Sequence, residues 1–512
     1  MSTKRYEEFK NRWLVEGTLT TLGPLHIGTG DWIEPKGGWD VPKDNWLRID
    51  KPSEKAKFAK VSGLMRDHAG RPYIPGSTLK GCVRSWLESK FSEKDAVVRR
   101  SFGYQDAGTK GDGRGGRWEF LDARMPDGKT VATQITAQTA IDRVTRTADD
   151  RKLFHCEVTP AGTEFLVRIA GQNLEDEEVA LLVEAMEGFN DESGAIAVGA
   201  GSADGWGRMK WVRTGLRKLT PDKLEEHLAA GRLAYEGLPV FEGTLPAAGV
   251  QKSAGAKIRI KVELRFDGAF LVNDPKRCKT KHDKKESDLP NHAPLRDERN
   301  EVYLPAASFR GAFRSQAERI FRTLGFQGLM NPSGRAALSM PEVRALRDPV
   351  SRLFGASGWR SPISISDFKL AKNDTRIVKR QEFVAIDRFT GGGAEHLKFN
   401  AEYVLRPVFH GTIEIDLDAL MRAGVGGWGL GLLAFTLRDL REGDITFGFG
   451  AAKGYGACRG RITEVKTLGL ANWPEQFRLP NKQAVEALFG GSGALTPEAA
   501  EWLTKLPVQE VA

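Results

Sequence analysis

The sequence is poor in cysteine. Its 512 residues include four cysteines, Cys82, Cys156, Cys278 and Cys458, and no two of them form a C-x-x-C pair. This spacing argues against a disulfide framework and against a zinc ribbon. Isolated cysteines are typical of a reducing compartment, so we expect a cytoplasmic protein.

Long apolar runs are also missing. The longest, residues 425–437, is short and glycine-rich, whereas a membrane-spanning helix needs about 20 apolar residues. The first ten residues, MSTKRYEEFK, hold no apolar core of a signal peptide. The pattern G-x-x-x-x-G-K-[ST] does not occur, so ATP hydrolysis is not expected. The sequence therefore predicts an intracellular protein without a membrane partner.

In other respects the composition is that of a globular protein. Hydrophobic residues make up 40% and charged residues 28%, which excludes a disordered chain. The 57 glycines form clusters without a G-X-Y period, which excludes collagen. The net charge of +9 is modest and by itself supports nucleic-acid binding only weakly. At about 100–200 residues per domain, the length predicts two to four domains.

An internal repeat divides the chain into two copies of one unit. Residues 73–85 (YIPGSTLKGCVRS) realign with 303–315 (YLPAASFRGAFRS) at an offset of 303 − 73 = 230. Three further pairs follow in the same order: AIDRVT at 140–145 with AIDRFT at 385–390, FHCE at 154–157 with FNAE at 399–402, and the glycine-aromatic loop at 199–208 with that at 448–457. Matches in one order indicate duplicated domains.

Both copies predict the same order of secondary-structure elements. Residues 14–22 and 257–266 alternate apolar and polar side chains, the period of a half-buried strand, and a helix follows near Ser77 and near Ser308. Strands are predicted next at 163–169 and 411–417, helices at 176–189 and from 418 to 423 or beyond, and last strands at 209–212 and 459–465. The order β-α-β-β-α-β predicts an α+β protein of two tandem ferredoxin-like domains.

These elements suggest four segments. The predicted domains are residues 1–213 and 256–465. Residues 214–255 contain a helix at 221–230 and a loose Gly/Pro/Ala stretch, which is typical of a linker. Residues 466–512 would be a C-terminal extension with a further helix at 497–506.

The start of the repeated helix is the most informative local feature. A helix N-terminus favours anions because its N–H groups are unpaired and its dipole end is positive. In both copies two basic residues four apart follow that start, and a glycine that costs about 0.5–1 kcal/mol lies beside the first of them. Phosphodiester groups would meet these conditions, and a solvated basic face is the alternative. The candidate phosphate-binding residues are Ser77, Thr78, Lys80, Arg84, Ser308, Arg310 and Arg314.

The motif PYIPGSTLKGCVRSWLE, the IDR-x-T segments and the glycine-aromatic loops resemble the RAMP superfamily of CRISPR proteins. More closely, the chain is similar to the seventh Cas family, the backbone subunit of type III effector complexes. Two such subunits would be fused in tandem, as in type III-D systems. The resemblance covers residues 12–213 and 256–465.

This resemblance implies an RRM-like palm that cradles the guide crRNA and a thumb hairpin that wedges between the guide and a complementary target RNA. The thumbs would lie near 124–150 and 369–396, around Arg143 and Arg388 of the IDR segments. The implied protein partners are the large signature subunit, the handle-binding subunit, the small subunit and further backbone subunits. Guide binding should weaken with salt and be independent of spacer sequence. Trp206 and Tyr455 would either stack on bases or close a turn onto the core.

Asp31 is the first catalytic candidate. It ends the segment LHIGTGD after the first strand, and in target-cleaving members of the family an aspartate in this loop is catalytic. The resemblance implies cleavage of target RNA by its own 2′-hydroxyl, with a divalent cation, Mg²⁺ or Mn²⁺, at Asp31. One carboxylate is too little for a two-metal nuclease, but it can orient or deprotonate a 2′-hydroxyl. His26 could assist, and an Asx-type turn is the alternative role of Asp31.

The corresponding loop of the second copy lacks the HIG-x-G pattern. Asp274 is the nearest positional match to Asp31 and is our second catalytic and metal-binding candidate. His282-Asp283, Asp288 and His292 are alternative ligands or bases, and a solvated mobile loop is the other interpretation.

Other functions stay open at this point. The chain could be a crRNA-binding scaffold that does not cleave, or a crRNA-processing endoribonuclease of the sixth Cas family. No histidine recurs between the copies, which argues against processing, and the IDR segment in both copies argues against the handle-binding fifth Cas family. The pattern Gly111-x-Gly113-x-x-Gly116 fits a dinucleotide fingerprint, but no strand precedes it and a flexible loop is predicted.

Overall fold

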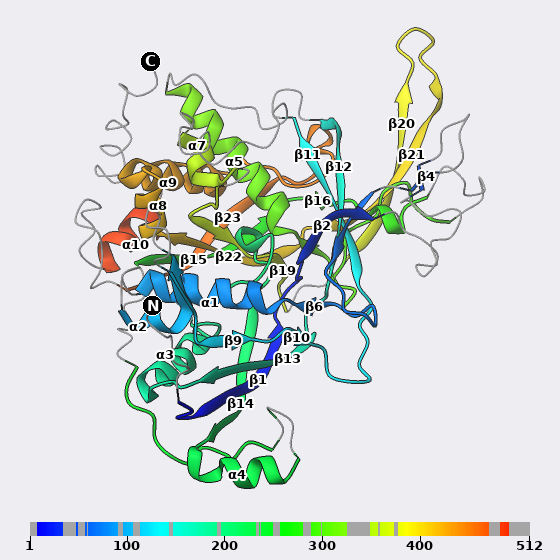
Figure 1. Ribbon diagram of the computed structural model, residues 1–512. Helices are drawn as coiled ribbons and strands as arrows, with labels where there is room; N and C mark the ends of the chain where they lie inside the picture. The colour runs from blue at the N-terminus through cyan, green and yellow to red at the C-terminus, as the bar shows by residue number, and fades with distance from the viewer. Residues whose placement is uncertain are drawn as a thin grey trace.

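The computed structural model is a mixed α+β protein with two sets of mainly antiparallel sheets, one in each half of the chain (Figure 1). It describes residues 8–33, 48–49, 57–58, 60–90, 96–105, 113–142, 147–191, 196–231, 235, 237–248, 256–279, 288–297, 299–324, 349–356, 359–372, 377–469 and 482–490. The "first half" below means residues 8–248, and the "second half" means residues 256–490. Among the described residues, no helix has the length and apolar character needed to cross a membrane.

The main sheet of the first half has six strands in the order β14-β1-β13-β10-β6, with β9 beside β13. The strands are β1 (Arg12–Thr21), β6 (Tyr73–Ile74), β9 (Trp118–Phe120), β10 (Ala123–Arg124), β13 (Glu164–Gln172) and β14 (Met209–Leu219). The helices of this half are α1 (Gly76–Lys90), α2 (Ala96–Phe102) and α3 (Asp176–Glu187). Leu79, Val83 and Leu87 of α1 recur every four residues and join one buried core with strand residues such as Trp13 and Phe165.

The second half repeats this sheet in the order β23-β15-β22-β19-β17, with β18 beside β22. Its strands are β15 (Lys257–Phe266), β17 (Tyr303–Leu304), β18 (Ile363–Ile365), β19 (Phe368–Leu370), β22 (Val408–Asp416) and β23 (Cys458–Leu468). Its helices are α5 (Ala306–Thr323), α7 (Pro349–Phe354), α8 (Leu417–Arg422), α9 (Gly426–Glu442) and α10 (Lys482–Gly490). Phe309 and Phe313 of α5 and Phe447 from the loop after α9 stack in the core of this half.

The duplication extends to irregularities of the backbone. The register of β1 against β14 shifts between Glu16 and Gly17, and that of β15 against β23 shifts between Lys261 and Val262. The two shifts are 261 − 16 = 245 residues apart, the offset found between the IDR segments. A bulge at the same position in both sheets is a conserved feature of the repeat rather than a local accident.

Each half also carries a long hairpin outside its main sheet. The first consists of β11 (Gln134–Ile141) and β12 (Ala148–Val158), which join β5 (Val61–Leu64) and β2 (Gly28–Ile33) in a four-stranded sheet. The second consists of β20 (Val378–Ile386) and β21 (Gly393–Leu405), which pair with β16 (Ala269–Phe270). Figure 1 shows the β20–β21 hairpin extending away from the body of the molecule. The remaining strands form two short pairs, β3 (Arg48–Ile49) with β4 (Lys57–Phe58) and β7 (Gly103–Gln105) with β8 (Gly113–Gly115).

The segment between the halves packs on the first half. β14 runs on to Leu219, past the boundary predicted at 213, and α4 (Pro221–Ala229) follows. Leu238 is buried against Leu14, Ala170 and Leu219, on the face of the sheet opposite the main core. The predicted linker therefore covers the outer face of the first sheet.

Candidate functional site

Asp31 lies on an irregular edge strand and is exposed. In β2, Gly28 pairs with Leu64 of β5 and Trp32 pairs with Ser62, so four steps along β2 match two along β5. Gly30 takes up this excess with a φ of 87°, a value that glycine adopts without strain. The Asp31 N–H donates to Thr29 Oγ1 at 3.1 Å. The exposed Asp31 side chain therefore lies on a bulged strand, where the sequence predicted a loop.

Buried polar contacts hold the segment that leads to this bulge. His26 Nδ1 donates to the carbonyl oxygen of Glu157 at 2.6 Å, and His26 Nε2 lies 3.3 Å from Ser62 Oγ. The fully buried Glu157 carboxylate pairs with Arg66 and accepts from the backbone N–H of Leu64 at 3.2 Å. Since a carbonyl oxygen only accepts, His26 Nδ1 carries a proton. The ring therefore links the backbone of β12 to Ser62 of β5. These contacts of His26 and Glu157 connect β5 and β12 to the segment that leads into β2.

Asp274, the second catalytic candidate, has different surroundings. Its side chain is 7% exposed, and its carboxylate accepts from the backbone N–H of Lys276 at 3.0 Å, at the start of the 3₁₀ turn η2 (Pro275–Arg277). Its own N–H donates to Ala293 O at 2.8 Å. This carboxylate caps a turn inside the protein, and the geometry argues against a catalytic or metal-binding role for Asp274.

The other candidate residues of that loop are His292, Asp288, His282 and Asp283. His292 stacks near Phe449, with ring centroids 4.5 Å apart, and burial lowers the pKa of its imidazole. The backbone carbonyl of Asp288 accepts from Arg380 at 3.0 Å. His282 and Asp283 lie outside the described residues.

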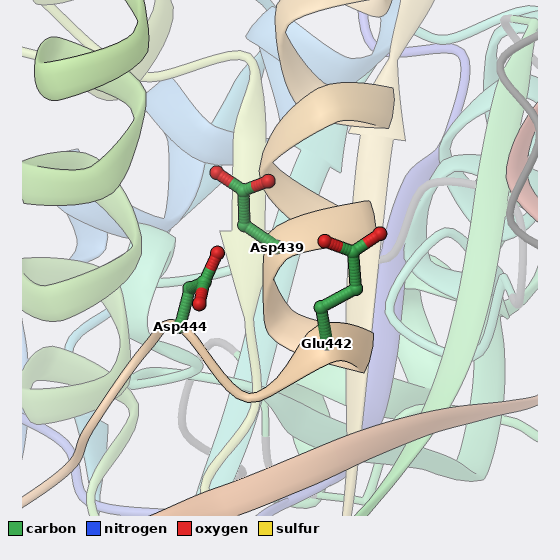
Figure 2. A group of neighbouring side chains, drawn as sticks. All are labelled: Asp439, Glu442 and Asp444. Atoms are coloured by element: carbon green, nitrogen blue, oxygen red, sulfur yellow. The ribbon is translucent and has the colours of Figure 1, made fainter.

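The described residues do not form a protein cage for a divalent cation at Asp31. One group of three acidic side chains has ligand oxygens within 4.8 Å of one another, and it consists of Asp439, Glu442 and Asp444 at the end of α9 (Figure 2). However, buried Asp439 accepts from Gln316 Nε2 at 2.6 Å and from Arg438 at 2.7 Å. Asp439 is thus engaged in packing α9 on α5. A cation at Asp31 would need most of its ligands from another molecule.

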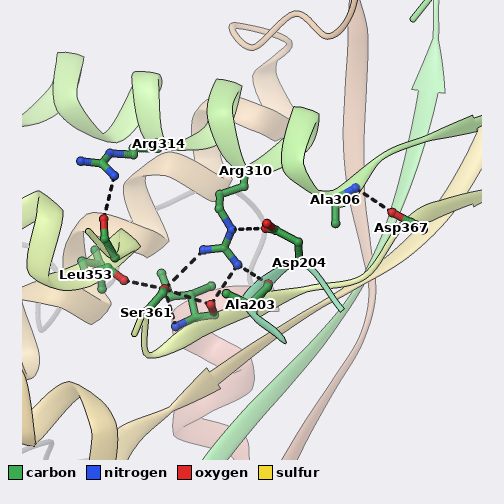
Figure 3. Close-up of polar contacts among 10 residues, drawn as sticks. Ala203, Asp204, Ala306, Arg310, Arg314, Leu353, Ser361 and Asp367 are labelled. Atoms are coloured by element: carbon green, nitrogen blue, oxygen red, sulfur yellow. Dashed lines mark hydrogen bonds and ion pairs between the residues drawn. The ribbon is translucent and has the colours of Figure 1, made fainter. Parts of the chain in front are cut away.

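The repeated helix starts already hold a carboxylate each. The Gly76 N–H of α1 donates to Asp122 Oδ1 at 3.0 Å, and the Ala306 N–H of α5 donates to Asp367 Oδ1 at 2.9 Å (Figure 3). The anion that the helix start favours is therefore supplied from within each half. Ser77 and Ser308 are exposed one and two residues further on, while Thr78 is half-buried.

The basic residues of these helices have partners within the protein. Lys80 Nζ donates to the Trp118 carbonyl at 3.3 Å, and burial followed by the nearby Arg84 lowers the Lys80 pKa. Arg84 pairs with Glu88 at 2.7 Å on the same helix. In α5, Arg314 donates to Glu318 Oε1, Gly355 O and Ser351 Oγ, each within 2.9 Å. The donors of Arg314 are thus engaged within the second half, which does not support the predicted phosphate contact.

Arg310 joins the two halves. Its guanidinium is 12% exposed and pairs with Asp204 of the first half at 2.6 Å (Figure 3). It also donates to the carbonyl oxygens of Ala203 and, at 3.0 Å, Ile363. An RNA phosphate would have to displace Asp204, so the surroundings of Arg310 do not support the predicted RNA contact.

The aromatic residues of the glycine loops face the protein. Tyr455 is buried beside Phe383 and Tyr403, and its hydroxyl donates to Gln381 Oε1 at 2.8 Å. Burial raises the pKa of Tyr455. The half-buried ring of Trp206 lies against Gly201 of its own loop. Of the two roles predicted for Tyr455, closing a turn onto the core fits this geometry.

The IDR segment of the second half forms a hairpin tip. Asp387 accepts from the N–H groups of Phe389 and Thr390 at 2.9 and 2.8 Å, and these hydrogen bonds lower its pKa. This turn leaves Arg388 exposed and the Phe389 ring 100% exposed. In the first hairpin, Asp142 N–H donates to Thr147 O at 2.9 Å, while Arg143 lies outside the described residues.

No pattern in the sequence indicated the exposed aromatic ring that lies beside the candidate carboxylate. Trp32 follows Asp31 in β2 and is among the exposed large hydrophobic residues. An exposed indole can stack on a base. A six-residue strand with a bulge has no regular alternation, so the pattern could not show which side Trp32 faces.

These features define a class of protein: two fused α+β units, each with a carboxylate-capped helix start, a glycine loop and an extended hairpin. The family described as the RAMP superfamily matches residues 18–210 and 248–459, one region in each half. The matched regions cover most of the 512 residues, and the chain belongs to the RAMP superfamily.

Part of the chain is also similar in sequence to a known CRISPR protein. The chain is 29% identical over 170 residues to a Mycobacterium tuberculosis protein described as CRISPR system Cms endoribonuclease Csm3. The match covers 30% of this chain and 60% of the length of that protein. The similarity is therefore distant and partial.

Proposed function

We propose that this protein is a backbone subunit of a type III CRISPR effector complex, that it binds guide crRNA, and that its first half cleaves complementary target RNA. Support comes from the two RAMP regions and from the distant similarity to an endoribonuclease named Csm3. The observation that carries the catalytic part is the exposed carboxylate of Asp31 on a bulge held by buried contacts.

Each half is proposed to be a ferredoxin-like, RRM-like palm with a thumb. In the first main sheet β1 lies between β14 and β13, the strand before α3, and in the second β15 lies between β23 and β22, the strand before α8. This arrangement supports the proposal of a split βαβ fold. The hairpins β11–β12 and β20–β21 would be the thumbs. Exposed Phe389 at the tip of the second hairpin and exposed Ile141 at the end of β11 suit insertion between stacked bases.

The proposed reaction is attack by a target 2′-hydroxyl on the adjacent phosphorus. The 2′-oxygen forms a bond to phosphorus, the bond to the 5′-oxygen breaks, and the Asp31 carboxylate accepts the 2′-proton while solvent protonates the 5′-oxygen. The thumb contributes by holding a displaced nucleotide with the 2′-oxygen in line with the phosphorus. The products would carry a 2′,3′-cyclic phosphate and a 5′-hydroxyl.

A divalent cation, Mg²⁺ or Mn²⁺, stays part of the proposal only as a requirement to be tested. The described residues around Asp31 supply one acidic ligand, so phosphate and ribose oxygens would complete any coordination shell. No chemical step is assigned to the ion.

The test is cleavage by the assembled complex. The wild-type chain, its guide and its partner subunits should cut 5′-labelled complementary RNA at regular intervals, and chelation with EDTA should stop the cuts. Asp31→Ala should remove these products while crRNA still co-purifies. Tight binding of guide and target without cuts in the wild type would make this chain a scaffold.

The expected partners follow from the same proposal. They are crRNA, target RNA, the large signature subunit, the handle-binding subunit, the small subunit and further backbone subunits. The buried cap formed by Asp274 favours a second half that binds without cutting.

A further inference from the structure

The glycine loop of the first half docks on the second half. Its 3₁₀ turn η1 (Ser202–Asp204) reaches the start of α5 and strand β18. The Arg310 guanidinium of α5 donates hydrogen bonds to the Asp204 carboxylate and to the Ala203 carbonyl oxygen (Figure 3). We call this contact the internal joint.

A second ion pair lies in the same joint. Arg208, which ends the glycine loop, pairs with Glu414 of β22 at 3.1 Å. Glu414 also pairs with Arg259 of β15 at 2.8 Å. The receiving surface of the second half thus consists of the α5 start and the charged outer face of its main sheet.

The second half carries the same loop without a receiver among the described residues. Its turn η4 (Ala451–Lys453) is flanked by left-handed Gly450 and Gly454, with φ of 82° and 81°. The first loop has 74° and 80° at Gly201 and Gly205. The tip of the second loop, residues 451–454, is exposed, and the Lys453 ammonium lies over the rings of Phe399 and Phe449, 5.8 and 5.4 Å from their centroids. Lys453 stands where the first loop has Asp204, so the docking charge is reversed.

The first half has the matching receiver, but with the wrong charge for a second copy of this chain. Lys80 of α1 donates to the Trp118 carbonyl of β9, as Arg310 of α5 donates to the Ile363 carbonyl of β18. Lys80 and Arg310 thus hold equivalent places. If one copy docked its second loop on the first half of another, Lys453 would approach Lys80.

The corresponding surface of the first half, formed by β9 and the outer face of the main sheet, is also partly covered by residues of the linker. Tyr235 donates its hydroxyl to Glu119 of β9 at 2.9 Å. Leu238 covers Leu14 and Ala170 on the outer face that, in the second half, carries the charged joint. A terminal repeat covered in this way does not extend a stack.

We propose that residues 448–457 are an open joint of this chain, and that its partner is another RAMP module with an acidic side chain at the place where α5 has Arg310. This inference rests on the proposed function, since it names the neighbour in such a complex. Head-to-tail contacts of this kind propagate unless something stops them. The like charges of Lys453 and Lys80, together with the covered face, direct the loop away from a second copy and toward a different subunit.

The first arm of the test is a double-mutant cycle at the internal joint of the full chain. Asp204→Lys gives the first loop the charge of the second, and Arg310→Glu gives its receiver the proposed charge. The thermal unfolding midpoint should fall in each single variant, and the double variant should unfold at a higher temperature than the two losses added predict. Lys453→Asp is the matched control. Its midpoint should fall less than that of Asp204→Lys, because it loses contacts with the Phe399 and Phe449 rings but no link between the halves. Additive losses would overturn the proposed charge rule.

The second arm locates the neighbour. A photo-cross-linking residue at Ala452 in the assembled complex should capture a helix start of a different RAMP module, in a peptide with Asp or Glu. Lys453→Glu should lower that yield about tenfold, and replacing the captured carboxylate by lysine should restore it. Capture of residues 76–90 of a second copy, of a peptide without an acidic residue, or of nothing would overturn the inference.

The two proposals fail in different ways. A complex that assembles on crRNA but shows no effect of Lys453→Glu leaves the proposed function standing and removes only the joint. For the purified chain without RNA, sedimentation velocity at low salt should show a monomer. Head-to-tail oligomers there would contradict the proposed joint, whether or not the complex cleaves RNA.

Discussion

The two halves share a sheet and differ in what surrounds it. Their main sheets have the same strand order, the same register shift in the first strand pair and an aspartate at the same helix start. The segment after the first strand is a bulged strand with exposed Asp31 in one half and a 3₁₀ turn capped by buried Asp274 in the other. Packing preserves the sheet, while loops held by that scaffold are free to diverge in chemistry.

The outer faces of the sheets differ as well. Leu14 and Ala170 of the first half lie under the linker, whereas Arg259 and Glu414 of the second half meet the loop of the first. The two copies of the unit thus meet at the internal joint, through Arg310–Asp204 and Arg208–Glu414. The contrast teaches that equivalent positions in the copies can have opposite roles.

The largest effect should come from comparing the two aspartates. Asp31→Ala should lower the rate of target cleavage about 10²–10⁴-fold, the range for losing one acid–base group. Asp274→Ala should leave the cuts in place and lower the unfolding free energy by about 1 kcal/mol, because it removes a cap. Mapping products from both variants in one complex measures both effects. Loss of a subset of cuts in Asp274→Ala would restore a second active site.

Two equivalent cations allow the next comparison. Arg310→Glu places a carboxylate beside Asp204 and removes a buried pair, so the unfolding free energy should fall by on the order of 3 kcal/mol. Lys80→Glu loses one hydrogen bond to a carbonyl, for a cost of about 1 kcal/mol. Denaturant unfolding of the full chain gives both values. Equal losses would mean that the internal joint adds little stability.

The sequence was enough to predict the order of elements but not their contacts. The repeat, read at offsets of 230 and 245, located the helix starts and placed β15 at residues 257–266, where the structure has it. The second IDR segment was expected near a thumb and lies at the tip of the β20–β21 hairpin. Such features are local, and alternation or a repeated motif records them.

Contacts between distant segments left no such record. Arg310 lies 106 residues from Asp204 and in the other half of the chain, and a basic residue on a helix face looks the same with or without a partner. Asp274 was chosen only as the nearest positional match to Asp31, and the sequence could not show that Asp274 is buried while Asp31 is exposed. The helix predicted at 497–506 and Arg143 lie outside the described residues, so those predictions stand as they were.

Low pH should weaken the internal joint, because it protonates Glu414. Burial favours the protonated form, but Arg208 and Arg259 outweigh it and hold the Glu414 pKa below its usual range. A depressed pKa contributes stability above the unfolded value of about 4.3, and that stability is lost as the pH falls through the folded value. The unfolding midpoint of the wild type should therefore exceed that of Glu414→Gln at pH 7, and the gap should close below about pH 4. A gap that is constant with pH would mean that Glu414 acts by shape alone.

The smallest effect is expected at the tip of the β20–β21 hairpin, the proposed second thumb. Phe389 is fully exposed, so Phe389→Ala should change the unfolding free energy by less than about 0.5 kcal/mol. If the ring stacks on a base, target RNA binding should weaken by about 1 kcal/mol, or roughly fivefold, which filter binding at fixed salt can measure. Phe383 is the matched control, because it stacks on Phe399 within the hairpin, with centroids 4.8 Å apart. Phe383→Ala should destabilise the hairpin itself, so reduced binding in Phe389→Ala at unchanged stability separates contact with RNA from support of the thumb.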